Sequence, residues 1–156
     1  MRALVYASLF VAAVLLFVPA RILALSGIAR PYAIGGVEVA GLTLGTLGAV
    51  IALWCVLAFA VMGKGTPAPF DPPRRLVVRG PYRFVRNPMY IGAGLAVGGA
   101  ALFYRSAVLL AYVALLWVIV HQFVRLYEEP TLKRLFGQEY DDYCRAVYRW
   151  WPRLSR

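Results

Sequence analysis

The sequence predicts an all-α integral membrane protein with about four transmembrane helices and a C-terminal amphipathic cytoplasmic helix. Composition is the first reason: 62% of the 156 residues are hydrophobic and the mean hydropathy is +0.68, whereas soluble domains contain about 45–50% apolar residues. The other two reasons are the length of the apolar segments and the one-sided distribution of charge. The chain has room for one compact helical bundle, so we expect a single domain over residues 1–156.

Four apolar segments supply the predicted membrane spans, at residues 4–25, 39–62, 89–104 and 106–124. A span needs about 20 residues, within a range of about 17–25, so the first, second and fourth segments are long enough. The third segment is short. It crosses fully if Tyr104 and Arg105 extend to the far interface, or it forms half of a hairpin that does not fully cross.

Two stretches beside these segments need separate interpretation. Arg2 before the first segment is typical of a signal peptide, but the segment has about 20 apolar residues and lacks a small-x-small cleavage site, so we expect a retained helix. Residues 63–73 contain four prolines and cannot form a helix. We expect an ordered or semi-extended loop there.

Charge predicts the orientation in the membrane, because Lys and Arg accumulate on the cytoplasmic side of short loops. Fourteen basic residues fall on one side of the predicted four-helix arrangement, and Arg21, Arg30 and Arg105 fall on the other. Both termini are then cytoplasmic. Arginine outnumbers lysine 15 to 2, which is typical of a GC-rich bacterial genome, so we expect the bacterial inner (cytoplasmic) membrane.

The formal net charge of +10 also bears on the partners of the protein. Basic residues near a membrane surface attract anionic lipids with about 1 kcal/mol each. Nucleic acid is the other common partner of a basic protein, but no segment of this chain has the pattern of a groove-reading module. We therefore expect membrane lipids, and no nucleic acid, among the partners.

The two cysteines and the single histidine predict neither a disulfide nor a metal site. Cys55 lies within the second apolar segment, and Cys144 lies in the predicted cytoplasmic tail, a reducing compartment. We expect packing roles for both. His121 is the only histidine, and neither cysteine has a partner at ligand spacing, so no metal is expected.

Glycines recur at helical spacing in two of the apolar segments. They are Gly41, Gly45 and Gly48 in the second segment and Gly94, Gly98 and Gly99 in the third. Small residues on one helix face let neighbouring backbones approach closely. Tight packing within the bundle is favoured over a dimerisation face, and both faces are expected to contact protein.

Two polar clusters flank the third and fourth apolar segments. The Asn-Pro cluster, residues 79–92, is a basic, Pro-punctuated turn, Arg-Gly-Pro-Tyr-Arg-Phe-Val-Arg-Asn-Pro-Met-Tyr-Ile-Gly, directly before an apolar helix. The Glu-Glu cluster, residues 125–143, is Arg-Leu-Tyr-Glu-Glu-Pro-Thr-Leu-Lys-Arg-Leu-Phe-Gly-Gln-Glu-Tyr-Asp-Asp-Tyr. Because the clusters lie at the two ends of one helical hairpin, they should meet on one face of the bilayer.

This pair of clusters resembles the isoprenylcysteine carboxyl methyltransferase and phospholipid methyltransferase superfamily, integral-membrane enzymes that use S-adenosylmethionine. The superfamily pattern is approximately Gly-Pro-Tyr-x-x-x-Arg-His/Asn-Pro-x-Tyr-x-Gly, a hydrophobic hairpin, then Glu-Glu-x-x-Leu-x-x-x-Phe-Gly-x-x-Tyr-x-x-Tyr. The resemblance covers residues 76–152. This chain has Asn87 where many members have histidine, so an imidazole role at that position does not transfer.

The resemblance implies a site for S-adenosylmethionine, and for its product S-adenosylhomocysteine, between the two clusters. The implied cofactor-binding residues are Tyr82, Asn87, Pro88, Tyr90, Glu128 and Glu129. Arg125 and Glu128 are the candidate catalytic residues. From its position, Arg125 suits a bidentate pair with an acceptor carboxylate or phosphate and equally suits a snorkelling residue at the helix end. Glu128 is a candidate base. No metal ligand is implied.

Each of these residues also has a purely structural interpretation. Glu128 and Glu129 are typical of a solvated turn where a helix leaves the bilayer. The tyrosines, with Trp150 and Trp151, are typical of an interfacial aromatic belt, and Pro88 is typical of a first helical turn. The joint order and spacing of the clusters favours the methyltransferase interpretation.

The tail after the fourth segment is predicted to form a lid. Its apolar residues recur at steps of three and four, which predicts one apolar stripe on a helix bent near Gly137. The stripe consists of Leu132, Leu135, Phe136, Tyr140, Tyr143, Val147 and Trp151. We expect this amphipathic helix to lie along the membrane and to close over a cofactor held between the clusters, leaving a lipid-facing opening for the acceptor.

We therefore expect a membrane methyltransferase that moves a methyl group from S-adenosylmethionine to a lipophilic or lipidated acceptor, similar to the isoprenylcysteine carboxyl methyltransferases. A carboxylate acceptor needs no base. An amine or thiol needs one, for which His121, Glu128 and Glu129 are candidates, although His121 is more typical of a packing residue. The alternatives are a phospholipid-amine N-methyltransferase, a small-thiol S-methyltransferase and, in another class, a non-catalytic membrane subunit.

Overall fold

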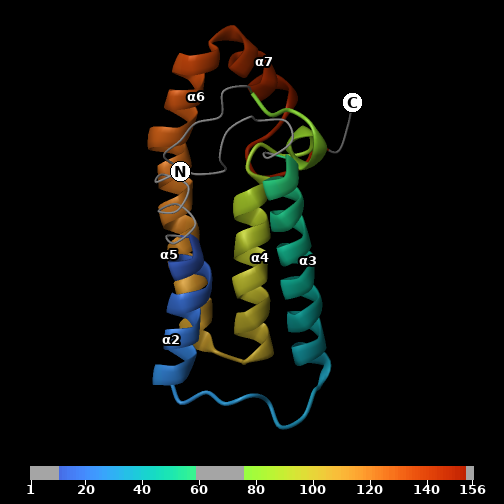
Figure 1. Ribbon diagram of the computed structural model, residues 1–156, viewed down its shortest axis with the longest axis vertical. Helices are drawn as coiled ribbons and strands as arrows, with labels where there is room; N and C mark the ends of the chain where they lie inside the picture. The colour runs from blue at the N-terminus through green and yellow to red at the C-terminus, as the bar shows by residue number, and fades with distance from the viewer. Residues whose placement is uncertain (1–10, 59–75, 154–156) are drawn as a thin grey trace.

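The structure is a computed structural model that describes residues 11–58 and 76–153. Within these ranges it is all-helical, as predicted, and contains no β-strand. The elements in chain order are the π-helical turn η1 (Ala13–Phe17), α2 (Val18–Leu25), α3 (Gly36–Ala58), the 3-10 turn η3 (Gly80–Arg83), α4 (Pro88–Phe103), α5 (Ala107–Phe123), the π-helical turn η4 (Val124–Glu128), α6 (Glu129–Phe136) and α7 (Gln138–Ala146). The long helices lie along one common axis, and α7 with η3 lies at one end of them (Figure 1).

Two helices among the described residues are long and apolar enough to cross a membrane. They are α3, with 23 residues, and the continuous helix Ala107–Phe136, with 30 residues. The second exceeds the predicted segment because α5 continues through η4 into α6. Helix α4 has 16 residues, a length of about 24 Å, and Ala13–Leu25 is shorter still. Four spans therefore remain a prediction.

Part of the predicted organisation lies outside the described residues. This applies to residues 4–10 of the first apolar segment, to the end of the second from residue 59, and to the Pro-rich stretch 63–73. The retained N-terminal helix and the extended loop therefore stay predictions.

Helix α3 packs against α4 through glycine, which brings the two backbones together. A Cβ atom at Gly41 or Gly48 of α3 would collide with α4 main-chain atoms, and one at Gly92 or Gly99 of α4 would collide with α3 main-chain atoms. This confirms the predicted packing role of the α3 glycines and of Gly99. The prediction is wrong for Gly98, where a Cβ would meet no atom within 4 Å.

The α4 interface uses Gly92 in addition to Gly99, and the sequence pattern did not select it. Gly92 and Gly99 are seven residues apart, which is two helical turns, so they share the face toward α3. Gly94 and Gly98 are four residues apart and lie on another face. A Cβ at Gly94 would make only ordinary contact, at 3.8 Å, with the ring of Trp117 from α5.

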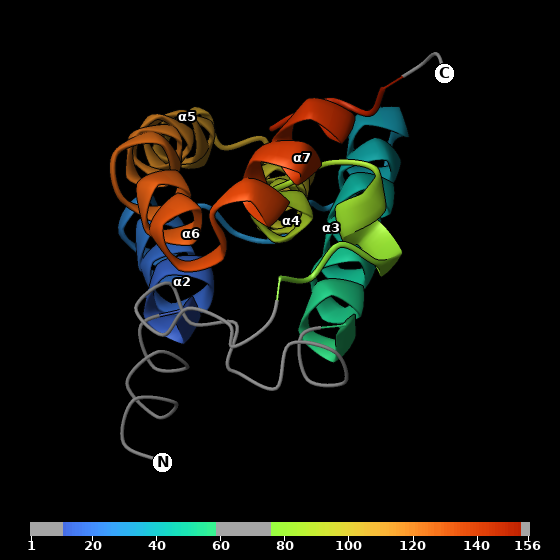
Figure 2. The same cartoon turned by 90° about the horizontal axis from the view of Figure 1, so that it is seen from above.

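Helices α2 and α5 form the second half of the bundle, with α4 between them and α3 (Figure 2). Val97 of α4 and the fully buried Leu109 of α5 belong to one cluster, against which Ile22 of α2 packs. The hydroxyl of Tyr112 in α5 donates to the carbonyl of Val14 at 2.7 Å. Apolar burial and this hydrogen bond therefore hold α2 against the hairpin of α4 and α5.

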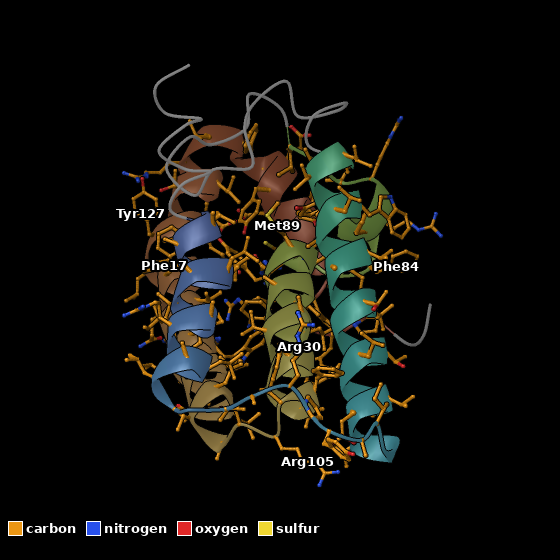
Figure 3. All side chains as sticks on the ribbon, turned by 60° about the horizontal axis from the view of Figure 1, so that its bottom comes forward. Phe17, Arg30, Phe84, Met89, Arg105 and Tyr127 are labelled. Carbon is orange, nitrogen blue, oxygen red and sulfur yellow. The ribbon has the colours of Figure 1, made fainter. Side chains whose placement is uncertain are left out.

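Large apolar side chains on the outside of the bundle face away from the protein. Phe17, Phe84 and Tyr127 point outward (Figure 3), with exposed fractions of 64%, 47% and 45%. On the long helices, Leu53 of α3 and Val118 of α5 are both 60% exposed. Continuous apolar exposure of this kind is typical of a surface that contacts lipid or another protein.

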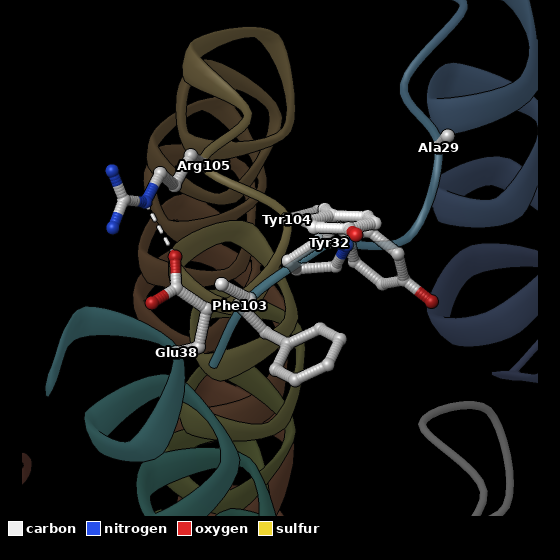
Figure 4. A pocket seen from close by; sticks show the side chains of 8 residues that line it. Ala29, Tyr32, Glu38, Phe103, Tyr104 and Arg105 are labelled. Carbon is white, nitrogen blue, oxygen red and sulfur yellow. Dashed lines mark hydrogen bonds and ion pairs between the residues drawn. The ribbon is translucent and has the colours of Figure 1, made fainter. Parts of the chain in front are cut away.

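The end of the bundle opposite α7 is joined by an ion pair between the buried Glu38 and the exposed Arg105. Glu38, in the first turn of α3 and 2% exposed, accepts from the Gly35 backbone N–H at 2.8 Å and from Arg105 Nε at 2.5 Å. Arg105 lies in the turn between α4 and α5 and has a positive φ of 48°. This pair borders a shallow hollow that is also lined by Tyr32 and Tyr104 (Figure 4).

The C-terminal segment bends at Gly137, as predicted, where φ is +51°. Tyr140, Tyr143 and Val147 are buried, and Leu132 and Phe136 pack against them together with Leu76. The predicted stripe is wrong for Leu135 and Trp151, which are 55% and 76% exposed. The helical period is interrupted at Gly137, so residues on the two sides of the bend do not continue one face.

Candidate functional site

The N-terminus of α4 is fixed by local sequence. Pro88 occupies the first turn, where its missing N–H costs no hydrogen bond. Before it, the 3-10 turn begins at Gly80, whose φ of +61° suits glycine. The buried Asn87 is the residue before the helix and has a non-helical backbone, with φ of −124° and ψ of 52°. The Asn-Pro cluster is therefore an ordered turn that leads directly into α4.

The two polar clusters meet at this end of the bundle, as the sequence predicts. The hydroxyl of Tyr90, in the first turn of α4, donates to Oε2 of Glu128 at 2.9 Å. Glu128 is the last residue of η4, where the π-helical turn gives a hydrogen bond from Glu129 N–H to the Val124 carbonyl. Isolated π-helical turns are frequent at functional sites. Glu128 is thus part of a continuous helix, and the interpretation as a solvated turn is wrong.

Glu129 has a different set of partners. It receives two hydrogen bonds from Arg149, from Nε to Oε1 at 2.7 Å and from Nη2 to Oε2 at 2.6 Å. Arg86 adds an ion pair from Nη2 to Oε1 at 3.2 Å. The three side chains are only 13–29% exposed. Glu129 is therefore bound on both oxygens by the protein itself.

Further hydrogen bonds join the Asn-Pro cluster to the chain after α7. Nδ2 of Asn87 donates to the Arg149 carbonyl at 3.3 Å, and the Arg86 backbone N–H donates to the Tyr148 carbonyl at 2.9 Å. Arg86 Nη1 also contacts Sγ of Cys144. These contacts place residues 144–149 directly over the turn before α4.

Tyr82 lies within the wall behind this turn. Its side chain is buried in a cluster with Cys55, Ala58 and Val77, and its carbonyl accepts from the Tyr143 hydroxyl at 2.6 Å. Burial raises the pKa of both tyrosines above the ordinary value. In this position Tyr82 supports the turn by packing, and its assignment as a cofactor contact stays a prediction.

Arg125 and His121 lie in the same continuous helix, before Glu128. Arg125 is exposed and takes part in none of the ion pairs among the described residues. His121 Nδ1 accepts from Trp150 Nε1 at 3.1 Å, and the Trp150 ring packs on Trp117 with centroids 4.6 Å apart. Trp150 therefore packs against α5, whereas Trp151 is exposed.

Two residues at this site were not among the predicted site residues. Arg149 is 20 residues beyond Glu129, and no helical or strand period relates them. Arg86 lies between predicted positions, but one basic residue among several carries no distinguishing signal. The Nε atom of Arg86 is buried and has no acceptor among the described residues. The sequence does not show this.

The described residues contain no group of three or more His, Cys, Asp or Glu side chains arranged to hold a metal ion. The hollow beside Glu38 and Arg105 (Figure 4) lies where α3 begins and α4 ends, at the other end of the bundle from α7 (Figure 1). The site at the α4 N-terminus consists of the carboxylates of Glu128 and Glu129, the guanidinium groups of Arg86 and Arg149, and buried aromatic side chains.

The fold and site define a class of protein: a helical bundle with two long apolar helices and a polar site at one of its ends. The family profile for phospholipid methyltransferases matches residues 37–139. The chain belongs to the phospholipid methyltransferase family. The matched region includes α3 and both polar clusters up to the first turn of α7, which confirms the superfamily predicted from the clusters.

Curated relatives support the same relationship. The chain is 32% identical over 123 residues to the nickel-cobalt-cadmium resistance protein NccN of Alcaligenes xylosoxydans xylosoxydans, covering 76% of this chain and 53% of NccN. It is 30% identical over 84 residues to probable protein-S-isoprenylcysteine O-methyltransferases of Oryza sativa subsp. indica and subsp. japonica, covering 53% of this chain and 44% of each. The chain spans about half the length of these relatives. No solved structure matches it.

Proposed function

We propose that this chain is an integral-membrane methyltransferase that moves a methyl group from S-adenosylmethionine to a lipophilic acceptor. The observation that carries the proposal is the hydrogen bond between Tyr90 and Glu128. It joins the two family motifs, 38 residues apart in sequence, at one end of the bundle. Family membership supports the reaction class, and two long apolar helices support the membrane location.

The residues at the α4 N-terminus have the chemistry that S-adenosylmethionine requires. The cofactor presents an ammonium group, a carboxylate, ribose hydroxyls, an adenine and a sulfonium. Glu128 offers acceptors for the ammonium or the hydroxyls, and the buried Arg86 Nε is a donor without an acceptor among the described residues. The ring of Tyr90 offers an aromatic face for a cation, worth about 0.5–2 kcal/mol. Asn87 and Pro88 would shape the adjoining wall.

Glu129 and Tyr82 belong to the same proposed site by family resemblance, but they also have protein partners. Both oxygens of Glu129 are bound by arginine, and Tyr82 packs against Cys55. We therefore propose that Glu128 contacts the cofactor most directly. Glu129 and Tyr82 would hold the surrounding wall in place.

The protein contributes alignment to the proposed reaction. The cofactor supplies a methyl group that its positively charged sulfur already activates. Holding two reacting atoms about 3–3.5 Å apart provides a large part of the rate enhancement, and the wall around Tyr90 and Glu128 would provide such a position. Arg125 lies in the same π-helical turn as Glu128 and is exposed, and its guanidinium would be available to pair with an acceptor carboxylate or phosphate.

For the acceptor we propose a lipophilic carboxylate, as in isoprenylcysteine carboxyl methyltransferases. The names of the two rice relatives, probable protein-S-isoprenylcysteine O-methyltransferases, support this choice. A phospholipid amine or a small thiol are alternatives, and Glu128 would then be the candidate base. Incubation of the purified protein with radiolabelled methyl donor and one acceptor of each type would identify the class by the labelled product. A labelled amine or thiol, with no labelled ester, would contradict the carboxylate proposal.

Calorimetry with S-adenosylhomocysteine in detergent tests cofactor binding directly. We expect the wild-type protein to bind, and Glu128→Gln and Tyr90→Phe each to weaken binding about tenfold or more, because each changes a hydrogen bond to a charged group. Glu139→Gln, at an exposed position of α7, is the matched control and should bind normally. Absence of binding by the wild-type protein would favour the non-catalytic subunit.

A further inference from the structure

The C-terminal segment, residues 140–150, is attached to the proposed site by the motif tyrosines Tyr140 and Tyr143 and by Arg149, which the family motifs do not include. Its buried tyrosines pack against Leu76 and α6, and Arg149 binds both oxygens of Glu129. The carbonyl of Arg149 accepts from Asn87. A single residue thus contacts one member of each polar cluster.

The neighbouring carboxylates Glu128 and Glu129 point in different directions. Adjacent residues of a helix do not face one another, and here Glu128 binds Tyr90 while Glu129 binds Arg86 and Arg149. Glu129 is the first residue of α6 and follows the last residue of η4. Holding its carboxylate in place therefore restrains rotation of the helix about its axis at this junction. The direction of Glu128 toward Tyr90 depends on the same rotation.

We propose that Arg149 is a positioning residue, which fixes Glu128 and Asn87 for cofactor binding by clamping residues 140–150 onto Glu129. This inference rests on the proposed function, because it concerns the same site. The family profile ends at residue 139, so Arg149 lies outside the matched region. Arg149 acts through Glu129 and Asn87 and is not assigned a contact with the cofactor or the acceptor.

Arginine suits this role better than lysine. The guanidinium is planar and can donate two parallel hydrogen bonds to one carboxylate, whereas lysine provides a single point charge. The 2.7 Å and 2.6 Å bonds of Arg149 to Glu129 have this bidentate form. Arg149→Lys should therefore keep the charge but hold the segment less firmly.

The chain supplies a matched control on the same segment. Arg145 pairs with Asp142 on the outside of α7, and the two side chains are 68% and 61% exposed. Exposed ion pairs of this kind contribute little to stability. Arg145→Ala removes one positive charge from α7, as Arg149→Ala does from the adjoining chain, but leaves the clamp intact.

The chain also contains a reporter for opening of the clamp. Cys144 lies in α7 against Arg86, and Cys55, the other cysteine of the chain, is fully buried. The rate of maleimide reaction with the folded protein therefore reports access to Cys144. The Cys144→Ser variant gives the background rate.

The first experiment measures this rate without any ligand. Arg149→Ala should raise the maleimide rate about tenfold or more. Losing hydrogen bonds to a charged group shifts the equilibrium between the closed and the open C-terminal segment by about that factor. Arg149→Lys should give an intermediate rate, and Arg145→Ala the wild-type rate. Equal rates in Arg149→Ala and Arg145→Ala would overturn the clamp, whatever reaction the protein performs.

The second experiment connects the clamp to the cofactor. Saturating S-adenosylhomocysteine should slow the labelling of Cys144 in the wild-type protein, and Arg149→Ala should bind it about tenfold more weakly, with Arg149→Lys between the two. Binding by the wild-type protein that is unchanged in Arg149→Ala would overturn the positioning role. If the wild-type protein does not bind S-adenosylhomocysteine, the proposed function fails. The labelling rates measured without ligand still show whether Arg149 holds the segment on Glu129.

Discussion

The hydroxyl of Tyr143 illustrates how single residues hold the proposed site in shape. It donates to the Tyr82 carbonyl at 2.6 Å, in a place where both side chains are buried. We expect Tyr143→Phe to lower the free energy of unfolding by about 1–3 kcal/mol, because a buried carbonyl loses its donor. Chemical unfolding in detergent measures this change. Tyr148→Phe, at a position that is 51% exposed, should be close to neutral, and an equal loss in both variants would contradict the assignment.

The same hydroxyl has a consequence for stability at high pH. Burial raises the pKa of Tyr143, so the unfolded chain ionises this residue first as the pH passes about 10. The stabilisation from Tyr143 is complete below that pH and is lost as the pH rises toward its folded-state pKa. The Tyr143→Phe protein should therefore lose less stability between neutral and alkaline pH than the wild-type protein.

At the residue scale the sequence predicted that the two family motifs meet, whereas the roles of their residues in cofactor binding stay predictions. Tyr90 and Glu128 are brought together as expected. Arg149 could not be predicted, because its contact with Glu129 depends on the bend at Gly137 and the fold of the chain after α7. The role of Glu129 was likewise hidden, since its partners lie 43 residues before it and 20 residues after it.

At the scale of elements, the glycine contact between α3 and α4 sets the position of the Asn-Pro cluster. Gly99→Ala should destabilise the protein by about 1–3 kcal/mol or more, because its Cβ would collide with the main chain of Gly41 and Gly45. Gly98→Ala, one residue earlier, should be neutral or stabilising by about 0.5–1 kcal/mol, since its Cβ meets open space. Thermal unfolding of the two variants measures the difference. Similar destabilisation by both would indicate that α4 is rotated relative to α3.

Element boundaries were predicted well where apolar runs end at a breaker and poorly where a helix continues through polar residues. Helix α4 begins at Pro88, next to the predicted start at residue 89. The fourth segment was expected to end near Val124, but the helix continues to Phe136. Pro130 would ordinarily interrupt a helix. Here the π-helical turn at Val124–Glu128 changes the hydrogen-bond pattern just before it, and such local adjustment is not visible in hydrophobic periodicity.

At the scale of the whole molecule, basic residues concentrate at the end that contains the proposed site. Arg83 and Arg134 lie there and are exposed, whereas Arg30 lies in the connection at the other end, before α3 (Figure 3). The positive-inside rule therefore predicts that the site is on the cytoplasmic side. In a cysteine-free background, Arg83→Cys and Arg134→Cys should react with an impermeant maleimide only from the cytoplasmic side. Arg30→Cys should react only from the opposite side, and opposite labelling of positions 83 and 134 would reject a shared face.

The proposed acceptor leads to a prediction about how chain length affects activity. Tyr90, Gly94 and Gly98 are spaced four residues apart, so they share one face of α4, and they extend about 12 Å along it from the proposed site. Open space lies next to Gly98, whereas the Trp117 ring lies beside Gly94, so a tail on this face would pass along that ring. A lipophilic tail that enters from the bilayer and follows this face would gain up to about 0.8 kcal/mol per buried methylene. For acceptors with one reacting head, KM should therefore fall with tail length until this face is covered.

A larger side chain at the far end of that face tests the route itself. Gly98→Leu should leave KM for short-tailed acceptors unchanged and raise it for long-tailed ones, because the added side chain occupies the space that a long tail would need. Gly98→Ala, with a single added methyl group, should have a smaller effect. Binding of S-adenosylhomocysteine should remain normal in both variants, because position 98 is two turns away from Tyr90. If KM does not depend on tail length in the wild-type protein, entry from the lipid is rejected and a small water-soluble thiol becomes the favoured acceptor.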